Sequence, residues 1–223
     1  MISVIAIDGP AGAGKSTLAR LLADRLGYRY IDTGAMYRAV TWKVLEKNID
    51  LEKIKNIIEL THSLDISFTT PDQTGENQVI VNGEILREEI RRPVVDKSVS
   101  KVAKIAEVRE EMVKMQREMA KNGKIVMDGR DIGSRVLPDA DLKIYLTATV
   151  EERAQRRYQD IKENNPDLTI SEVKKQIEKR DKIDKNRKHS PLIKTEDALC
   201  INTTDMNIEE TLNYILKIIE EGE

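Results

Sequence analysis

The sequence predicts an α/β fold in which a parallel sheet is flanked by helices, and three observations carry that prediction. Short apolar segments rich in Val and Ile recur along the chain, amphipathic segments separate them, and a glycine-rich turn joins the first strand to the first helix. Because parallel strands need crossover connections, strands that alternate with helices favour a doubly wound sheet.

The N-terminal elements follow from the spacing of the apolar residues. Residues 3–8 are typical of a short strand, and apolar side chains at helical spacing predict a helix over 16–26 that ends at Gly27. We expect a second strand over 28–31, followed by a helix that Thr33 caps.

Residues 64–92 break this pattern, because apolar and polar side chains alternate there and Pro71 and Gly75 interrupt them. The dipeptide Asn82-Gly83 is a strong hairpin signal. We interpret the segment as a small antiparallel insertion that lies outside the main sheet.

The second half of the chain returns to helices and buried strands. Residues 94–121 show helical spacing in two stretches. The compact apolar runs 124–127 and 142–146 are typical of strands in a parallel sheet, where both faces are covered. An amphipathic helix that starts near Ile208 closes the chain.

The composition limits the size of the domain and the class of its partners. A chain of 223 residues suits one domain with mobile attachments. The net charge of −2, from 37 basic and 39 acidic side chains, gives no global attraction to nucleic acid or to an anionic membrane. We expect a monomer whose partners are small molecules, with neither nucleic acid nor membrane among them.

The apolar segments and the cysteine content indicate a location. No apolar run approaches the roughly 20 residues that span a bilayer, and the N-terminus enters a strand without a signal-peptide pattern. The single cysteine, Cys200, lies in the apolar stretch 198–201, and we expect it to be a small buried hydrophobic residue. These features predict a cytoplasmic protein.

A phosphate-binding motif follows the first strand, because residues 9–16 match G-x-x-x-x-G-K-S/T. Its glycines let backbone N–H groups point into one concavity, and the following helix adds its positive end. Lys15 supplies a cation for the phosphates, while Ser16 and, through water, Asp128 at a strand end are expected to hold Mg²⁺. The predicted ATP ligands here are Gly9, Pro10, Ala11, Gly12, Ala13, Gly14, Lys15, Ser16 and Thr17.

Many arginines fall near predicted loops and helix ends. Arginine binds phosphate with two parallel hydrogen bonds and stays protonated, so converging arginines suit an enzyme that holds two anionic substrates. A regulatory GTPase would need an Asn-Lys-x-Asp motif, and the nearest segment, residues 202–205, lacks the lysine. We therefore expect guanidinium groups from distant segments to converge opposite the phosphate-binding motif.

Three blocks resemble the signatures of the bacterial cytidylate kinase family: DTGAMYR at 32–38, DGRDIG at 128–133, and the run that begins Arg180-Asp181 and ends Asn186-Arg187. They occur in the family's order, and the resemblance extends from Ile5 to about Thr204. It implies a P-loop NTPase fold and transfer of the γ-phosphoryl group of ATP, with Mg²⁺, to CMP or dCMP, giving CDP or dCDP and ADP.

The resemblance also implies roles at the matching positions. The catalytic residues would be Lys15, Arg38, Arg130 and Arg180. The residues that read the cytosine edge would be Ser100, Arg109, Asp131 and Arg187. Asp184 would meet the ribose, and Thr33 stands where the family often has serine. Taken alone, Arg180 and Asp184 are four residues apart and also fit an ion pair on a helix face, worth about 0.3–0.5 kcal/mol.

The implied organisation is a single kinase domain over residues 1–223. Its core would comprise about 1–32, 106–150 and 169–223, its monophosphate-binding region about 33–105, and its lid about 151–168. Arg153 and Arg157 in the lid would bind ATP, and closure of the lid would exclude water.

Two other functions also fit the phosphate-binding motif. One is a kinase with another acceptor, such as UMP, AMP or shikimate; a hydroxyl acceptor would make Asp128 or Asp131 a candidate general base. The other is a binding protein in which ATP drives a conformational switch with little turnover. A phosphate acceptor needs no base, because it is already ionised at neutral pH.

Overall fold

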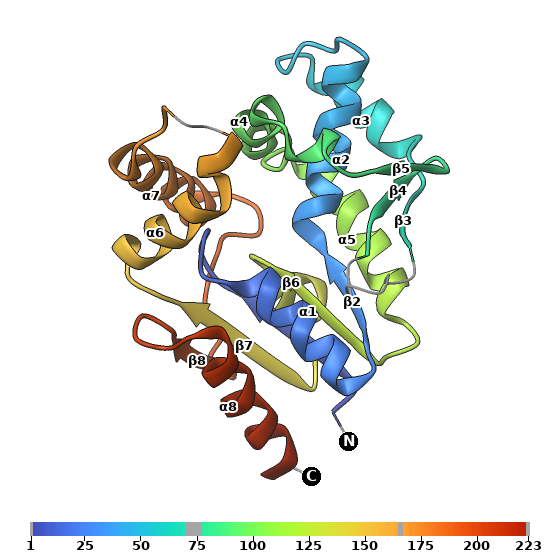
Figure 1. Ribbon diagram of the computed structural model, residues 1–223. Coiled ribbons are helices and arrows are strands. Elements are labelled where there is room, and N and C mark those ends of the chain that lie inside the picture. The colour runs from blue at the N-terminus through green and yellow to red at the C-terminus, as the bar shows by residue number, and fades with distance from the viewer. Residues whose placement is uncertain (1, 70–76, 165–166, 222–223) are drawn as a thin grey trace. The chain divides into compact units, whose positions relative to one another are not determined.

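The computed structural model describes residues 2–69, 77–164 and 167–221 (Figure 1). The chain divides into two compact units, which we call unit 1 (Met1–Arg29 and Lys124–Glu223) and unit 2 (Tyr30–Gly123). None of the helices in the described ranges is long and apolar enough to cross a membrane.

The main sheet has five strands in the order β2-β6-β1-β7-β8. β1 (Val4–Asp8) is parallel to both β6 (Ile125–Gly129) and β7 (Leu142–Thr147), and β8 (Leu199–Asn202) is parallel to β7. At the other edge is β2 (Arg29–Asp32), in which the chain passes from unit 1 to unit 2. The predicted parallel sheet with flanking helices is confirmed.

Helices α1 (Lys15–Leu26) and α8 (Ile208–Glu221) pack against each other, and α1 also contacts β6. Leu18 and Leu22 of α1 and Ile215 of α8 are fully buried, because apolar residues at helical spacing form one continuous stripe. α1 ends as predicted at Gly27, whose left-handed conformation lets its N–H bond back to the last turn.

A pair of packed helices completes unit 1 between β7 and β8. α6 (Val150–Ile161) runs into the short 3₁₀ helix η3 (Lys162–Asn164), and α7 (Ile170–Asn186) packs against α6. The centre of their contact is apolar and comprises Ala154, Val173 and Ile177. The predicted lid falls on α6 and η3, and its residues 165–166 lie outside the described ranges.

Unit 2 is built mainly from helices. α2 (Thr33–Glu46) packs against α4 (Pro93–Val102) and the 3₁₀ helix η1 (Glu89–Arg91). α5 (Ala106–Ala120) contacts α2 and α3 (Ile54–His62), so it groups with unit 2. The division into core, monophosphate-binding region and lid stays a prediction.

The predicted antiparallel insertion is confirmed as a sheet of three strands in unit 2. β3 (Ile66–Phe68) pairs with β4 (Val79–Val81), which pairs with β5 (Glu84–Leu86). Asn82 and Gly83 join the last two strands with φ values of 50° and 83°, which matches the positive φ angles of a tight hairpin. Pro71 and Gly75 lie outside the described ranges.

Two local predictions were wrong. Thr33 is the first residue of α2, and the cap is Asp32, whose side chain accepts a hydrogen bond from Ala35 N at 2.8 Å. A carboxylate caps a helix as well as a hydroxyl does, and Asp32 lies one residue before Thr33. Cys200 is exposed, because β8 is an edge strand whose side chains alternate and Ile201 is the residue that faces the core.

We expect Gly9→Ala to destabilise the protein far more than Gly27→Ala. Both glycines have positive φ angles, but a Cβ atom on Gly9 would lie 2.0 Å from the backbone oxygen of Leu146, whereas one on Gly27 would meet no atom within 4 Å. Urea unfolding should show that the free energy of unfolding falls by about 1 kcal/mol in Gly27→Ala and by at least about 3 kcal/mol in Gly9→Ala. Equal losses would contradict the predicted clash.

Candidate functional site

The phosphate-binding turn lies between the end of β1 at Asp8 and the start of α1 at Lys15. Gly12 and Gly14 have φ values of 76° and 84°, so the turn uses a conformation that other residues rarely adopt. Gly14 is the N-cap of α1 and has no side chain to occupy the N–H groups of the first turn. The helix therefore presents donors and its positive end to an anion.

Lys15 is buried, and its Nζ donates a hydrogen bond to the Pro10 carbonyl at 2.8 Å. The pKa of Lys15 is lowered to about 7, first by burial and then by the nearby Arg130 and Arg180, against the opposing effect of Asp128. Lys15, Arg130 and Arg180 therefore lie close enough within unit 1 for their charges to act on one another. A polyanion bound in the turn would relieve their mutual repulsion.

Ser16 and Asp128, the two predicted Mg²⁺ ligands, lie within hydrogen-bond distance of each other. Ser16 Oγ donates a hydrogen bond to Asp128 Oδ2 at 3.1 Å, although 112 residues separate them. Hydroxyl and carboxylate oxygens are the hard donors that Mg²⁺ prefers, so the pair fits that ion. In the described part of the chain, no group of three or more His, Cys, Asp or Glu side chains forms a metal-binding cluster.

Asp8 is a site residue that the sequence reasoning missed. Its carboxylate accepts hydrogen bonds from Ile132 N and Gly133 N, both at 2.8 Å, at the start of the π-helical turn η2 (Ile132–Val136). Burial raises the pKa of Asp8 to about 6, although the two N–H groups oppose that shift. Asp8 thereby fastens the loop that carries Arg130 and Asp131 to the end of β1.

Arg130, Asp184 and Arg187 form an ionic cluster in unit 1. Arg130 Nε lies 2.9 Å from Asp184 Oδ2, and Arg187 Nη1 lies 3.7 Å from Asp184 Oδ1. Burial disfavours the Asp184 carboxylate, but Arg130, Arg187 and Arg180 outweigh it and lower the pKa. Asp184 therefore does more than form an ion pair within its own helix α7, because its partner Arg130 lies directly after β6.

The arginines of α6 are engaged by protein groups. Arg153, predicted as a direct ATP ligand, is buried and donates to the carbonyl oxygens of Ala11 and Ala148. Arg157, the other predicted lid ligand, is half-buried and acts electrostatically on Asp160.

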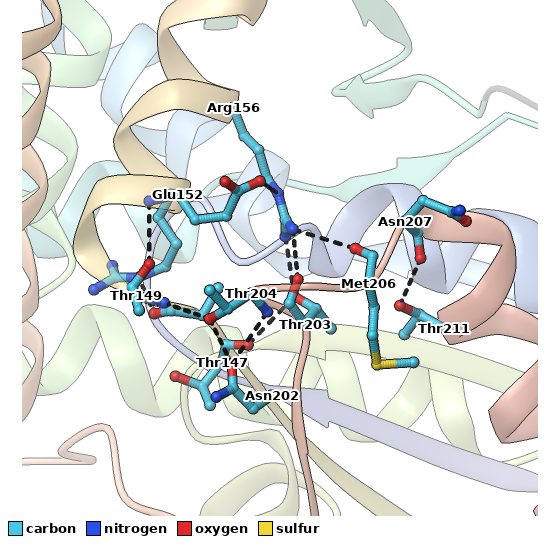
Figure 2. Close-up of polar contacts among 12 residues, drawn as sticks. Thr147, Thr149, Glu152, Arg156, Asn202, Thr203, Thr204, Met206, Asn207 and Thr211 are labelled. Carbon is cyan, nitrogen blue, oxygen red and sulfur yellow. Dashed lines mark hydrogen bonds and ion pairs between the residues drawn. The ribbon is translucent and has the colours of Figure 1, made fainter.

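Arg156 connects α6 to the segment after β8 (Figure 2). Its Nε donates to Glu152 Oε1 at 2.8 Å, and its terminal nitrogens donate to Thr203 Oγ1 at 3.0 Å and to the carbonyl oxygens of Thr203 and Met206 at 2.7 and 3.4 Å. Its Nη1 lies 3.9 Å from where a Cβ atom of Gly14 would be. Arg156 thus lies beside the phosphate-binding turn.

Unit 2 carries the other predicted acceptor ligands. Arg38 Nε lies 3.5 Å from Asp96 Oδ1, and a Cβ atom on Gly34 would lie 3.1 Å from Arg38 Nη1, so glycine leaves room for this guanidinium. Arg109 is buried, with its guanidinium carbon 5.3 Å from the centre of the Tyr37 ring. Two further predicted ligands are Thr33, which is buried, and Ser100, which is half-buried.

We expect Asp184→Asn to destabilise the protein at pH 7 by about 3 kcal/mol, because it removes the buried anion that pairs with Arg130 and Arg187. The folded pKa of Asp184 is below its ordinary value of 3.8, so its stabilising effect is present above that value and is lost as the pH falls through the folded pKa. In urea unfolding, the difference in the free energy of unfolding between wild type and the variant should become smaller below pH 4. A difference independent of pH, or an equal one for the exposed control Asp139→Asn, would contradict this.

Comparison with known proteins shows the family of the chain. The family model described as cytidylate kinase matches residues 5–221. The cytidylate kinase of Caldanaerobacter subterraneus subsp. tengcongensis is 51% identical over 218 residues, which cover 98% of this chain and 95% of the relative. That of Caldicellulosiruptor bescii is 51% identical over 214 residues, covering 96% and 94%. A crystal structure of an uncharacterized protein from Eubacterium ventriosum shares the fold alone, with a TM-score of 0.55, 14% identity and 99% of each chain covered. The chain belongs to the cytidylate kinase family.

Proposed function

We propose that the protein transfers the γ-phosphoryl group of ATP to CMP or dCMP, giving CDP or dCDP and ADP. We base this on the family match over residues 5–221, which spans every predicted site residue. In support, Lys15 of the turn lies close enough to Arg130 and Arg180 of unit 1 for their charges to lower its pKa.

The chemistry requires alignment and charge neutralisation. The phosphate of CMP is already ionised at neutral pH, so no general base is needed. The turn from Gly9 to Ser16, with Thr17, would bind the ATP phosphates through backbone N–H groups. Lys15 and Arg130, with Arg180, would stabilise the charge on the migrating group, and Arg38 would bind the acceptor phosphate.

The same residues would hold Mg²⁺. Ser16 Oγ would be a direct ligand, and Asp128 would act through water. When bound, Mg²⁺ offsets the negative charge of the β- and γ-phosphates.

The ligands proposed to recognise the acceptor are those that the family resemblance implies. The proposed ligands of the base are Ser100, Arg109, Asp131 and Arg187, with Thr33 as a further contact. Asp184 would accept a hydrogen bond from the ribose, since its oxygens have lone pairs beyond those that the arginines use. Residues 151–168, including Arg157, would act as a lid that excludes water and so prevents hydrolysis of ATP.

An assay of ADP release across a panel of acceptors tests this function. We expect CMP and dCMP to stimulate ATP consumption and to yield CDP and dCDP. UMP, AMP and shikimate should be poorer substrates. Preference for one of those acceptors would replace the proposal with another kinase, and ATP use without a phosphorylated product would indicate a nucleotide-driven switch. We further propose a cytoplasmic monomer, and sedimentation would show its mass.

Lys15→Ala should lower kcat by at least about 10²- to 10³-fold while the protein stays folded, because the variant loses a cation at the transferring phosphates. The measurement is kcat with CMP together with a thermal unfolding curve. Arg25→Ala removes one exposed cation from the same helix and should leave kcat unchanged. Wild-type turnover in Lys15→Ala would remove the turn from the mechanism.

Arg187→Ala should reduce the preference for CMP over UMP by about tenfold, because a guanidinium that reads the base edge contributes about 1–3 kcal/mol of discrimination. The measurement is the ratio of kcat/KM for the two acceptors. Lys188→Ala, an exposed neighbour, is the matched control. An unchanged ratio in Arg187→Ala would rule out its role in base recognition.

A further inference from the structure

One residue of the phosphate-binding turn, Ala11, is held through both its backbone N–H and its backbone carbonyl by a buried ion pair. Arg153 Nη1 donates to the Ala11 carbonyl at 2.9 Å and to Asp181 Oδ2 at 2.6 Å. The other oxygen of that carboxylate, Asp181 Oδ1, accepts from Ala11 N at 3.2 Å. The donor and the acceptor of Ala11 are thus closed into a ring with Arg153 and Asp181, which we call the Ala11 bracket.

The bracket is buried, and its arginine is also held by a residue outside it. The exposed fractions of Arg153 and Asp181 are 4% and 8%, so water does not screen their attraction. Arg153 Nε also donates to the Ala148 carbonyl at 3.0 Å, which orients the guanidinium plane. Arg153 lies on α6 and Asp181 on α7, and the apolar contact between these helices sets the distance between the two side chains.

The neighbours of Ala11 tie the bracket to the phosphate ligands. On one side, the Pro10 carbonyl accepts from Lys15 Nζ at 2.8 Å. On the other side, a Cβ atom on Gly12 would lie 2.8 Å from the backbone oxygen of Arg153, so the turn lies directly against α6. A shift of the Ala11 backbone would therefore move the Pro10 carbonyl, which accepts from Lys15 Nζ, and also the N–H groups of the turn that follow Ala11.

We propose that Arg153 and Asp181 are positioning residues. They hold the backbone of Ala11 so that, before ATP binds, the turn has the shape that binds its phosphates. The inference rests on the proposed ATP site and adds a role for the helices α6 and α7. Neither side chain needs to touch ATP. Pre-arranged donors avoid the free-energy cost of ordering the turn when the nucleotide binds.

Two conservative variants test the bracket. Arg153→Lys keeps the charge but lacks the planar fork that reaches Ala11, Ala148 and Asp181, and Asp181→Asn keeps the shape but loses the charge. We expect each to raise the Kd for the non-hydrolysable analogue AMP-PNP, measured by calorimetry, by about tenfold or more, and to raise the KM for ATP likewise. The KM for CMP should stay within about twofold of wild type.

A matched control lies on the same two helices. Lys174 Nζ of α7 bonds to Glu151 Oε1 of α6 at 2.6 Å in an ion pair that includes no residue of the turn. Lys174→Met should therefore bind AMP-PNP as wild type does. An equal loss of affinity in this variant would assign the effect to loosened helices and overturn the bracket.

A double variant separates positioning from stability. Arg153→Met/Asp181→Leu replaces the buried pair with apolar side chains, which can restore the thermal unfolding midpoint if the single variants unfold. We expect it to keep the weakened AMP-PNP affinity, because Ala11 stays unheld. Wild-type affinity in this variant, or in both conservative variants, would overturn the proposal. The AMP-PNP affinity does not depend on which acceptor the enzyme uses. If CMP were not phosphorylated, the proposed function would be refuted, and the AMP-PNP affinity would still test the bracket.

Discussion

The concentration of positive charge beside the phosphate-binding turn is the constraint on which the rest of unit 1 depends. Lys15 is buried near Arg130 and Arg180, so its charged form is disfavoured. Burying a cation without a partner costs free energy, and carboxylates at strand ends and on α7 reduce that cost. Asp128 and Asp184 offset part of this charge and leave the remainder for a polyanionic ligand.

The close approach of the backbone at the turn follows from the same constraint. Donors must point inward, so the chain has to curl tightly, and side chains would obstruct the curl at Gly9 and Gly12. The first is packed under the end of β7 and the second under the start of α6. The glycines of the motif therefore serve the packing of the surrounding elements as well as the phosphates.

The sequence was most informative where neighbouring residues determine the structure. The strands predicted at 3–8, 28–31, 124–127 and 142–146, the helix that ends at Gly27 and the hairpin at Asn82-Gly83 follow from local spacing and turn chemistry, and the structure confirms them, whereas the edge strand β8 was not predicted. The two predicted Mg²⁺ ligands, Ser16 and Asp128, lie within hydrogen-bond distance of each other, and their role in metal binding stays a prediction. The missed contacts join distant segments: Arg153 reaches Asp181 across 28 residues, and Asp8 holds Ile132 across 124. No periodicity encodes such pairs, because they depend on how helices pack onto the sheet.

Exposure of Cys200 has a practical use. The sequence contains one cysteine, and it lies on the edge strand β8 with its side chain exposed. A maleimide dye would therefore attach at a single defined position without mutagenesis. The chain continues from Cys200 to Thr203 and Met206, whose carbonyl oxygens bind Arg156, so such a dye would report by fluorescence on the environment of that loop.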